Sequence, residues 1–357
     1  MNKVILLAPT PPPVGGIASW TVRMMNASLP NGWKVGVVDE KIIGNREFFG
    51  DKTKHNIVNE VKRCFKIWNG LRRALKDRDA KVVHACIAAN TLPVLREYVS
   101  ACITRLCRRK FIIHFRCTVP NMVVGKVNRL AVKLLCNKAN CIMLLNEQSK
   151  EFIQKITRTR TCVIPNFVEA EEVIESHQIR EKIERVLYVG GVIESKGCLD
   201  IIEIAKKNPE IEFRLIGNAE EACANAAETV PNVVLKGTMP HAEIRKEMED
   251  ADVFMFLTYF PGEGFSNSLA EAMASGLPCI VTDWAANRDM IEDKGGIIVP
   301  VHGIDETIKA LVHMSDASIR KSQSDFNISK VKLKYSSKEV QKEYVDCYES
   351  MLGKIDE

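Results

Sequence analysis

The chain alternates short β-branched or apolar runs with longer segments of helical periodicity, and this alternation restricts its fold more than any other feature. The pattern is typical of a parallel sheet whose strands are joined by crossover helices. It runs through the first half of the chain and starts again near residue 185, so we predict two doubly wound α/β domains. The predicted strands are residues 4–8, 35–38, 82–85, 111–114, 141–145, 162–164, 185–189, 212–216, 233–235, 253–257, 278–282 and 296–299.

The length of the chain allows two domains, and its net charge changes sign between the two halves. At about 150 residues per domain, 357 residues are enough for two domains with a core each. Residues 1–165 contain 29 Lys and Arg against 10 Asp and Glu, a net charge of +19, whereas the remainder contains 21 against 35, a net charge of −14. We place the domain boundary in the polar stretch 165–184 and expect the first half to bind anions.

The cysteines and the hydropathy of the chain indicate the cellular compartment in which the protein works. The twelve cysteines include no CxxC pair, and most lie in apolar runs, which predicts buried free thiols in a reducing cytosol. The N-terminal apolar run is stopped by proline after too few residues for a secretory signal. No window approaches the ~18 apolar residues of a spanning helix. The sequence therefore predicts a cytoplasmic protein that does not cross a membrane by itself.

In each predicted domain, a glycine-containing loop follows the first strand. Ligands of such sheets bind at loops of this kind. Gly15 and Gly16 precede a helix predicted from residue 17, and adjacent glycines let backbone N–H groups approach a phosphate. A plain tight turn explains them equally well, and the spacing is not a dinucleotide fingerprint. In YVGGVIESKG, Lys196 lies among glycines at a loop that suits a pyrophosphate, or is a solvated surface lysine.

The segment FPGEGFSNSLAEAMASG carries two glutamates, Glu263 and Glu271, among small and apolar residues. It predicts a loop followed by a helix that is capped by Ser266 or Asn267 and ended by Gly276. Glu263 is then at the mouth of the loop, and Glu271 is about one turn inside the helix. A buried carboxylate needs partners, which paired hydroxyls of a polyol or a structural arginine could both supply.

These motifs carry a resemblance. EGFSNSLAE followed by AMASGLPCIVTD, with YVGGVIESKG upstream and a GG loop near the N-terminus, resembles glycosyltransferase family 4, the retaining GT-B enzymes. The resemblance covers nearly the whole chain. It implies two Rossmann-like doubly wound domains facing across a cleft: an acceptor-binding domain at 1–165, a nucleotide-sugar donor domain at 166–335, and a helix at 336–357 that returns to the first domain.

The resemblance also implies roles for single residues. Glu263 and Glu271 match the EX7E glutamates, the first contacting the donor sugar and the second the ribose; Lys196 matches the lysine that neutralises the diphosphate. His114, at a strand end, matches the histidine near the sugar, although a lone histidine there is usually structural. The implied catalytic residues are thus Glu263, His114 and Lys196. The implied donor-binding residues are Gly15, Gly16, Gly190, Gly191, Lys196, Gly264, Phe265, Ser266, Asn267, Ser268, Leu269 and Glu271.

The sequence departs from the family pattern at three positions. Gly191 occupies the place of an arginine, so one positive charge on the leaving diphosphate is missing or comes from another residue. Ser266 replaces a glycine or proline, and Phe167 replaces a glycine after Asn166. These departures affect the donor geometry more than the fold.

No cofactor and no metal are expected. A literal DxD, Asp77 to Asp79, precedes its strand instead of following it, so we interpret it as a solvated turn. Charge on the departing nucleotide must then be met by Lys196, helix N-termini and loop amides.

The function that follows is retaining transfer of a hexose-type sugar from a nucleoside diphosphate to a hydroxyl, on a lipid-linked or cell-surface polysaccharide precursor. A nucleotide-sugar epimerase of similar architecture and a non-catalytic nucleotide-sugar-binding subunit are the alternatives. A nucleic-acid partner is not predicted, because the basic half has few interleaved aromatic residues and no recognised motif.

A basic amphipathic helix favours work at a membrane. Apolar residues recur at helical spacing between residues 57 and 75, with basic residues among them, and a second cationic stretch spans 105–110. The apolar stripe could instead pack on the first sheet. Either way, we expect an anionic acceptor, of which a polyprenyl-linked phosphate sugar is the favoured kind, and peripheral binding to the inner, anionic face of the membrane.

Overall fold

The computed structural model describes residues 2–12, 15–41 and 57–353. The chain forms two compact units, and each is described by itself. Unit 1 comprises Met1–Pro165 together with Val340–Glu357, and unit 2 comprises Asn166–Glu339. The last helix, α14 (Ser337–Ser350), therefore begins in unit 2 and continues in unit 1.

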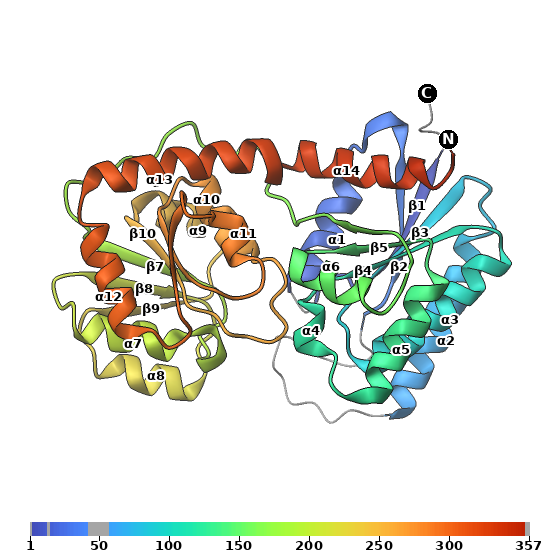
Figure 1. The fold of residues 1–357 in the computed structure, drawn as a ribbon, viewed down its shortest axis with the longest axis horizontal. Helices are drawn as coiled ribbons and strands as arrows, with labels where there is room; N and C mark the ends of the chain where they lie inside the picture. The colour runs from blue at the N-terminus through green and yellow to red at the C-terminus, as the bar shows by residue number, and fades with distance from the viewer. Residues whose placement is uncertain (1, 13–14, 42–56, 354–357) are drawn as a thin grey trace. The chain divides into compact units, whose positions relative to one another are not determined.

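Unit 1 contains a six-stranded parallel sheet with the order β2-β1-β3-β4-β5-β6 (Figure 1). Its strands are β1 (Lys3–Ala8), β2 (Lys34–Asp39), β3 (Ala80–Ile87), β4 (Lys110–Phe115), β5 (Cys141–Leu144) and β6 (Thr161–Val163). Its other helices are α1 (Gly16–Asn26), η1 (Pro30–Gly32), α2 (Ile57–Ala74), α3 (Thr91–Leu106), α4 (Val119–Met122), α5 (Gly125–Lys138) and α6 (Glu147–Gln154).

Helices cover both faces of this sheet, which is why its central strands are mostly apolar. Successive side chains of a strand point to opposite faces. Val83 and Ala85 belong to the core that lies under α2, α3 and α5, whereas His84 of the same strand is in ring contact with α1 and α14. Figure 1 shows α2, α3 and α5 side by side on one face.

Unit 2 contains a second six-stranded parallel sheet with the order β12-β11-β10-β7-β8-β9. Its strands are β7 (Arg185–Val189), β8 (Glu212–Ile216), β9 (Val233–Gly237), β10 (Val253–Phe256), β11 (Cys279–Thr282) and β12 (Gly296–Val299). Its helices are η2 (Ala170–Glu172), η3 (Glu194–Lys196), α7 (Cys198–Lys206), α8 (Glu221–Glu228), α9 (His241–Asp250), α10 (Asn267–Ala274), α11 (Asn287–Ile291), α12 (Ile304–His313), α13 (Ala317–Lys330) and the π-helical η4 (Val331–Tyr335).

The two doubly wound sheets and all twelve predicted strands are confirmed. In each sheet the direction of winding reverses at the first strand of the unit. In unit 2, β7 lies between β8 and β10, so the chain leaves β7 toward one edge and returns on the other side as β10. The loops at the carboxyl ends of β7 and β10 therefore meet at a switch point, where open α/β sheets bind ligands.

Candidate active site

Lys196 is held by the loop that follows β7. Lys196 is the last residue of the short helix η3. The next residue, Gly197, has a φ of +76° and is the N-cap of α7. A Cβ at residue 197 would lie 2.2 Å from the carbonyl oxygen of Leu257, at the end of β10. Only glycine fits this approach. The glycine that the sequence places after Lys196 thus brings the lysine against the neighbouring strand.

Glu263 comes from the loop after β10 and meets Lys196 there. The Lys196 Nζ donates a hydrogen bond to Glu263 Oε2, and the two side chains are 20% and 10% exposed. The ammonium group also lies 4.9 Å from the ring centroid of Phe260, within the range of a cation–π contact. The structure therefore pairs two of the three predicted catalytic residues in one ion pair.

Hydrogen bonds tether the loop after β10 on two sides. The amide of Tyr259 donates to the carbonyl of Ser195, in the loop after β7, over 2.9 Å. The indole of Trp284, which follows β11, donates to the carbonyl of Phe260 over 2.8 Å. The ion pair is thus supported by tethered backbone, which is what a preorganised electrostatic site requires.

Glu271 lies on the second turn of α10 and has a histidine partner that the sequence did not indicate. His241 Nε2 lies 3.5 Å from Glu271 Oε1, and His241 Nδ1 lies 3.5 Å from Glu172 Oε1. The alternative predicted for Glu271 is a structural arginine, and Arg245 of α9 lines the same small pocket as Glu271, together with Met248.

The residues between the two glutamates build the start of α10. Ser266 is the N-cap, and its Oγ accepts from the amide of Leu269 over 3.3 Å. Gly276, just after the helix, has a φ of +67°. The predicted cap and stop are confirmed. Asn267 Oδ1 accepts from Asn166 over 2.7 Å.

Several predicted donor-binding residues are buried within unit 2. Gly264, Phe265, Ser266 and Leu269 are buried, and Phe265 makes an edge contact with the ring of Tyr335. Ser268 is half-buried, and its hydroxyl oxygen lies 3.2 Å from that of Ser266. The structure gives these side chains packing and capping contacts; donor binding by this segment stays a prediction.

The remaining predicted loops are backbone features. Gly190 and Gly191 follow β7, where the Tyr188 hydroxyl donates to the Gly191 carbonyl over 2.8 Å. In unit 1, Gly15 is the N-cap of α1 in an extended conformation, and the helix begins at Gly16, one residue earlier than predicted. Residues 13 and 14 of this loop lie outside the described residues.

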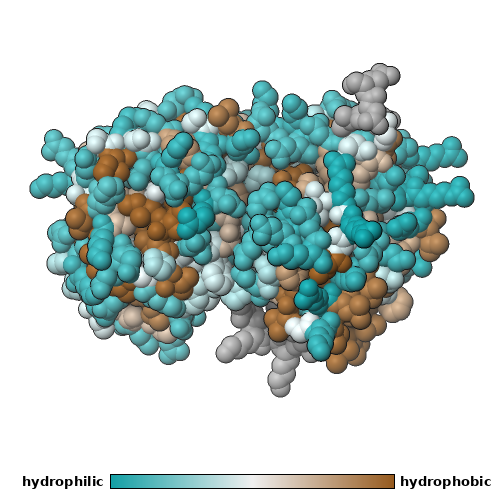
Figure 2. Space-filling view, in the orientation of Figure 1, coloured by the Kyte–Doolittle hydropathy of each residue, from teal (hydrophilic) through white to brown (hydrophobic). Residues whose placement is uncertain are grey.

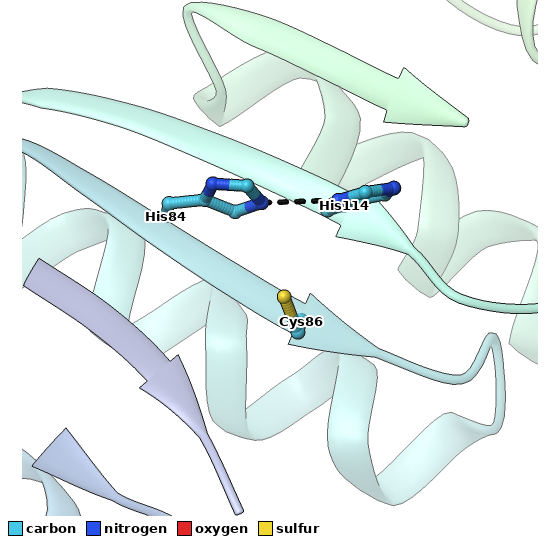
Figure 3. A group of neighbouring side chains, drawn as sticks. All are labelled: His84, Cys86 and His114. Carbon is cyan, nitrogen blue, oxygen red and sulfur yellow. Dashed lines mark hydrogen bonds between the residues drawn. The ribbon is translucent and has the colours of Figure 1, made fainter. Parts of the chain in front are cut away.

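His114, the third predicted catalytic residue, is fully buried in unit 1 (Figure 3). Its Nδ1 lies 3.1 Å from His84 Nε2, and His84 Nδ1 hydrogen-bonds to the hydroxyl of Tyr348 over 2.8 Å. Burial, with the nearby charge of Arg116, lowers the pKa of His84 to about 3 and that of His114 well below its ordinary value. Both rings are therefore neutral at pH 7.

Arg116, two residues after His114, is a functional candidate that the sequence analysis did not single out. It follows the end of β4, is 7% exposed, and stacks over the ring of Trp20 at 4.5 Å. A buried guanidinium at the carboxyl end of a central strand suits an anion. Its position two residues beyond His114, on the same face of the strand, is the signal that could have indicated it.

Two groups of described side chains have the composition of metal ligands. His84, Cys86 and His114 offer ligand atoms within 4.8 Å of one another (Figure 3). However, the Arg116 guanidinium lies 3.4 Å from His114 Nδ1 and would repel a cation. The sulfur atoms of Cys141, Cys162 and Cys347 lie 3.6–4.0 Å apart, which is also ordinary packing of free thiols. Both groups belong to unit 1, whereas Lys196 and Glu263 belong to unit 2.

Comparison with known proteins finds a family likeness for the region around Lys196 and Glu263. Residues 183–316 match the family model "Glycosyl transferases group 1". The matched region contains the loops after β7 and β10 and the whole of α10.

Two curated relatives align with more of the chain than the family model does. An uncharacterized glycosyltransferase of Methanocaldococcus jannaschii is 24% identical over 280 residues, 70% of this chain and 66% of that protein. A UDP-Gal:α-D-GlcNAc-diphosphoundecaprenol α-1,3-galactosyltransferase of Escherichia coli is 25% identical over 234 residues, 57% of this chain and 60% of that protein. The matches thus span 66% and 60% of the length of these two curated relatives, less than two thirds of each.

Solved glycosyltransferase structures share the fold of the chain. Sucrose-phosphate synthase from Thermosynechococcus elongatus has a TM-score of 0.79 at 14% identity, over 99% of this chain and 100% of that one. The Anabaena protein HepE in complex with UDP has a TM-score of 0.73 at 14% identity, over 98% and 100%. At such identity the likeness shows the fold alone, which is the GT-B fold predicted from the sequence.

Proposed function

We propose that the chain is a retaining glycosyltransferase that moves a hexose-type sugar from a nucleoside diphosphate to a hydroxyl of a lipid-linked or cell-surface polysaccharide precursor. The observation that carries the proposal is the Lys196–Glu263 pair at the switch point of the region that matches the family model "Glycosyl transferases group 1". Support for the donor comes from HepE, which was solved with UDP and with UDP-glucose. Support for the acceptor comes from the E. coli relative, whose name specifies a diphosphoundecaprenol.

The chemistry follows from the charges of the pair. In the transfer, the bond from the anomeric carbon to the diphosphate oxygen breaks, and the acceptor oxygen bonds to that carbon on the same face. The acceptor proton goes to the departing phosphate oxygen. Lys196 has three donor hydrogens, so it can hold Glu263 with one and the diphosphate with the others. Glu263 is then fixed next to the donor sugar, where its carboxylate orients sugar hydroxyls.

Glu271 has a different task in this proposal. A carboxylate one turn inside α10 suits the paired hydroxyls of the ribose, and its contact with His241 sets its orientation. Gly191, which stands where the family has an arginine, leaves Lys196 with a larger share of the diphosphate charge.

Replacement of each glutamate by alanine should separate these two tasks. We expect Glu271→Ala to weaken binding of the nucleotide, and Glu263→Ala to reduce turnover with little change in nucleotide affinity, because only Glu263 lies beside the sugar. Calorimetric titration with UDP and initial rates of transfer measure the two effects. Glu249→Ala, an exposed glutamate of α9, is the matched control. If both site variants keep wild-type affinity and rate, the assignment of the pair is wrong.

Transfer should not depend on a divalent metal. Asp77, the first aspartate of the DxD, lies in the turn before β3, where it accepts from the amide of Asp79 over 2.9 Å and pairs with Lys3 over 3.1 Å. We expect unchanged initial rates after treatment with EDTA. Loss of transfer on chelation that Mg²⁺ or Mn²⁺ restores would contradict this prediction.

Product analysis separates the proposal from its alternatives. An epimerase would convert the donor sugar without an acceptor, and a non-catalytic subunit would bind UDP-sugars without releasing UDP. A transferase releases UDP in step with glycosylated acceptor. We further propose that the enzyme acts in the cytoplasm at the inner face of the membrane, where a polyprenyl-linked acceptor and the +19 charge of residues 1–165 would meet.

A further inference from the structure

Three neighbouring helices of unit 1 expose apolar side chains where a surface helix normally carries polar ones. We call six of them the apolar face: Phe65 of α2, Leu92 and Leu95 of α3, and Val127, Leu130 and Leu134 of α5. These side chains are 47–76% exposed. Because α3 packs against both α2 and α5, they belong to one surface. Figure 2 shows apolar surface gathered over the part of unit 1 where Figure 1 draws α2, α3 and α5.

Helix α3 is the clearest sign that this exposure is not accidental. Its polar residues Arg96, Glu97, Ser100 and Thr104 are buried, whereas Leu92 and Leu95 point outward. The amphipathic pattern of a surface helix places polar residues outside and apolar residues against the core. Here the pattern is partly reversed, which marks the outer face of α3 as a surface for an apolar partner.

The charges around the apolar face select the partner. Lys62 and Lys66 of α2 and Lys126, Arg129 and Lys133 of α5 are exposed beside it. Within α2, α3 and α5, all of which the structure describes, the acidic residues are Glu60, which pairs with Arg63 over 3.2 Å, and the buried Glu97. Apolar side chains bordered by exposed cations match the acyl–headgroup boundary of an anionic bilayer.

We propose that the apolar face docks unit 1 onto an anionic lipid bilayer by inserting its side chains into the interfacial region. The proposal rests on the proposed function for its setting, a lipid-linked acceptor, and gives that function a membrane contact. A second copy of the chain fits this face less well, because a two-fold contact would bring the lysines of both copies together. Among the described residues no helix is long and apolar enough to span a membrane.

The structure divides the apolar stripe that the sequence indicates between residues 57 and 75. The predicted stripe on α2 is divided: Leu71 and Leu75 are buried in the core under α2, and Trp68 packs against it, whereas Val61 and Phe65 are exposed. Most of the apolar face lies on α3 and α5, which the sequence analysis did not assign to a membrane. Binding should therefore have an apolar part that salt does not screen, in addition to an electrostatic part.

Cosedimentation with vesicles tests the proposal. Wild-type protein should bind vesicles of phosphatidylglycerol and phosphatidylcholine, bind phosphatidylcholine alone more weakly, and retain part of its binding at high salt. The variant Leu95→Glu/Val127→Glu should lose at least ~10-fold in partition coefficient, because two apolar contacts are replaced by charges. The matched control, Val312→Glu/Leu333→Glu, makes the same change at two exposed positions of unit 2 and should bind as the wild type does.

Insertion itself has a separate readout. A Phe65→Trp variant should show blue-shifted fluorescence on anionic vesicles and quenching by lipids with brominated acyl chains, relative to the wild type. Equal binding by the two double variants, or no binding of wild type to anionic vesicles at low salt, overturns the proposal. A dimer of wild type in sedimentation velocity that Leu95→Glu/Val127→Glu dissociates, without vesicle binding, overturns it in favour of a second copy.

The same samples distinguish failure of this proposal from failure of the proposed function. Thermal shifts with UDP-sugars report on the donor site, which the variants of unit 1 leave intact. Protein that is stabilised by UDP-sugars and ignores vesicles loses only the docking surface. Protein that binds vesicles through the apolar face but neither binds nor turns over a nucleotide sugar keeps the surface and loses the proposed function.

Discussion

Replacement of Lys196 by alanine should reduce the rate of sugar transfer by at least ~10²-fold, the scale for loss of one preorganised contact to developing negative charge. The effect should be large because Gly191 stands where a second cation is expected, so Lys196 carries more of the diphosphate charge. Initial rates at saturating donor and acceptor measure it. Lys246→Ala, which removes an exposed lysine from α9, is the control and should leave the rate unchanged.

Loss of Lys196 also leaves Glu263, 10% exposed, without its ammonium partner, so a change in stability must be separated from a change in catalysis. The double variant Lys196→Met/Glu263→Gln removes both charges and keeps similar volumes. We expect it to regain the thermal stability that Lys196→Ala loses but not the activity. Wild-type activity in either variant would mean that another cation holds the diphosphate.

The strands and the start of α10 could be predicted because their signals are local. Buried strands of a parallel sheet are contiguous apolar runs, and Ser266 and Gly276 cap a helix by contacts within a few residues of themselves. The contact between Lys196 and Glu263 was not predicted, because it depends on β7 and β10 being neighbours in the sheet. Alternation of strand and helix shows a parallel sheet but does not fix which of its strands lie side by side.

The environment of His114 could not be predicted, because it depends on a distant segment. Strand alternation places His84 and His114 on one face of the sheet, but the residue that completes their hydrogen-bonded chain, Tyr348, comes from α14. Periodicity likewise grouped Val61 with Leu71 on α2 without telling that only Leu71 meets the core. His241, the partner of Glu271, belongs to a helix whose packing no local pattern reveals.

The second large effect concerns the polar residues buried beneath α3. Arg96 Nη2 lies 2.7 Å from Glu40 Oε2, and its Nε lies 2.6 Å from Glu97 Oε1, with all three side chains nearly inaccessible. Burial, together with the charge of Glu97, raises the pKa of Glu40 well above its ordinary value. Arg96→Met should cost about 3–5 kcal/mol of unfolding free energy, because it leaves two buried carboxylates without their counter-charge.

The sign of the pH dependence gives this prediction a second readout. A carboxyl whose folded pKa is raised favours folding at pH values below its ordinary pKa, and that contribution is lost as pH rises through the folded pKa. Without Arg96 the loss should be larger. The stability deficit of Arg96→Met should therefore be greatest at pH 7–8 and shrink as the pH falls toward ~4.5, because protonation of Glu40, whose pKa is raised, removes one of the unpaired buried charges.

Urea unfolding at several pH values measures the deficit, with Arg72→Met, at an exposed position of α2, as the control. The triple variant Glu40→Gln/Arg96→Met/Glu97→Gln should recover most of the lost stability, since neutral side chains remove the unpaired charge. A deficit of Arg96→Met that equals the Arg72→Met effect, or that grows as the pH falls, would contradict the prediction. These charges lie under α3, the helix that carries Leu92 and Leu95. Their removal should therefore weaken vesicle binding only where it unfolds unit 1.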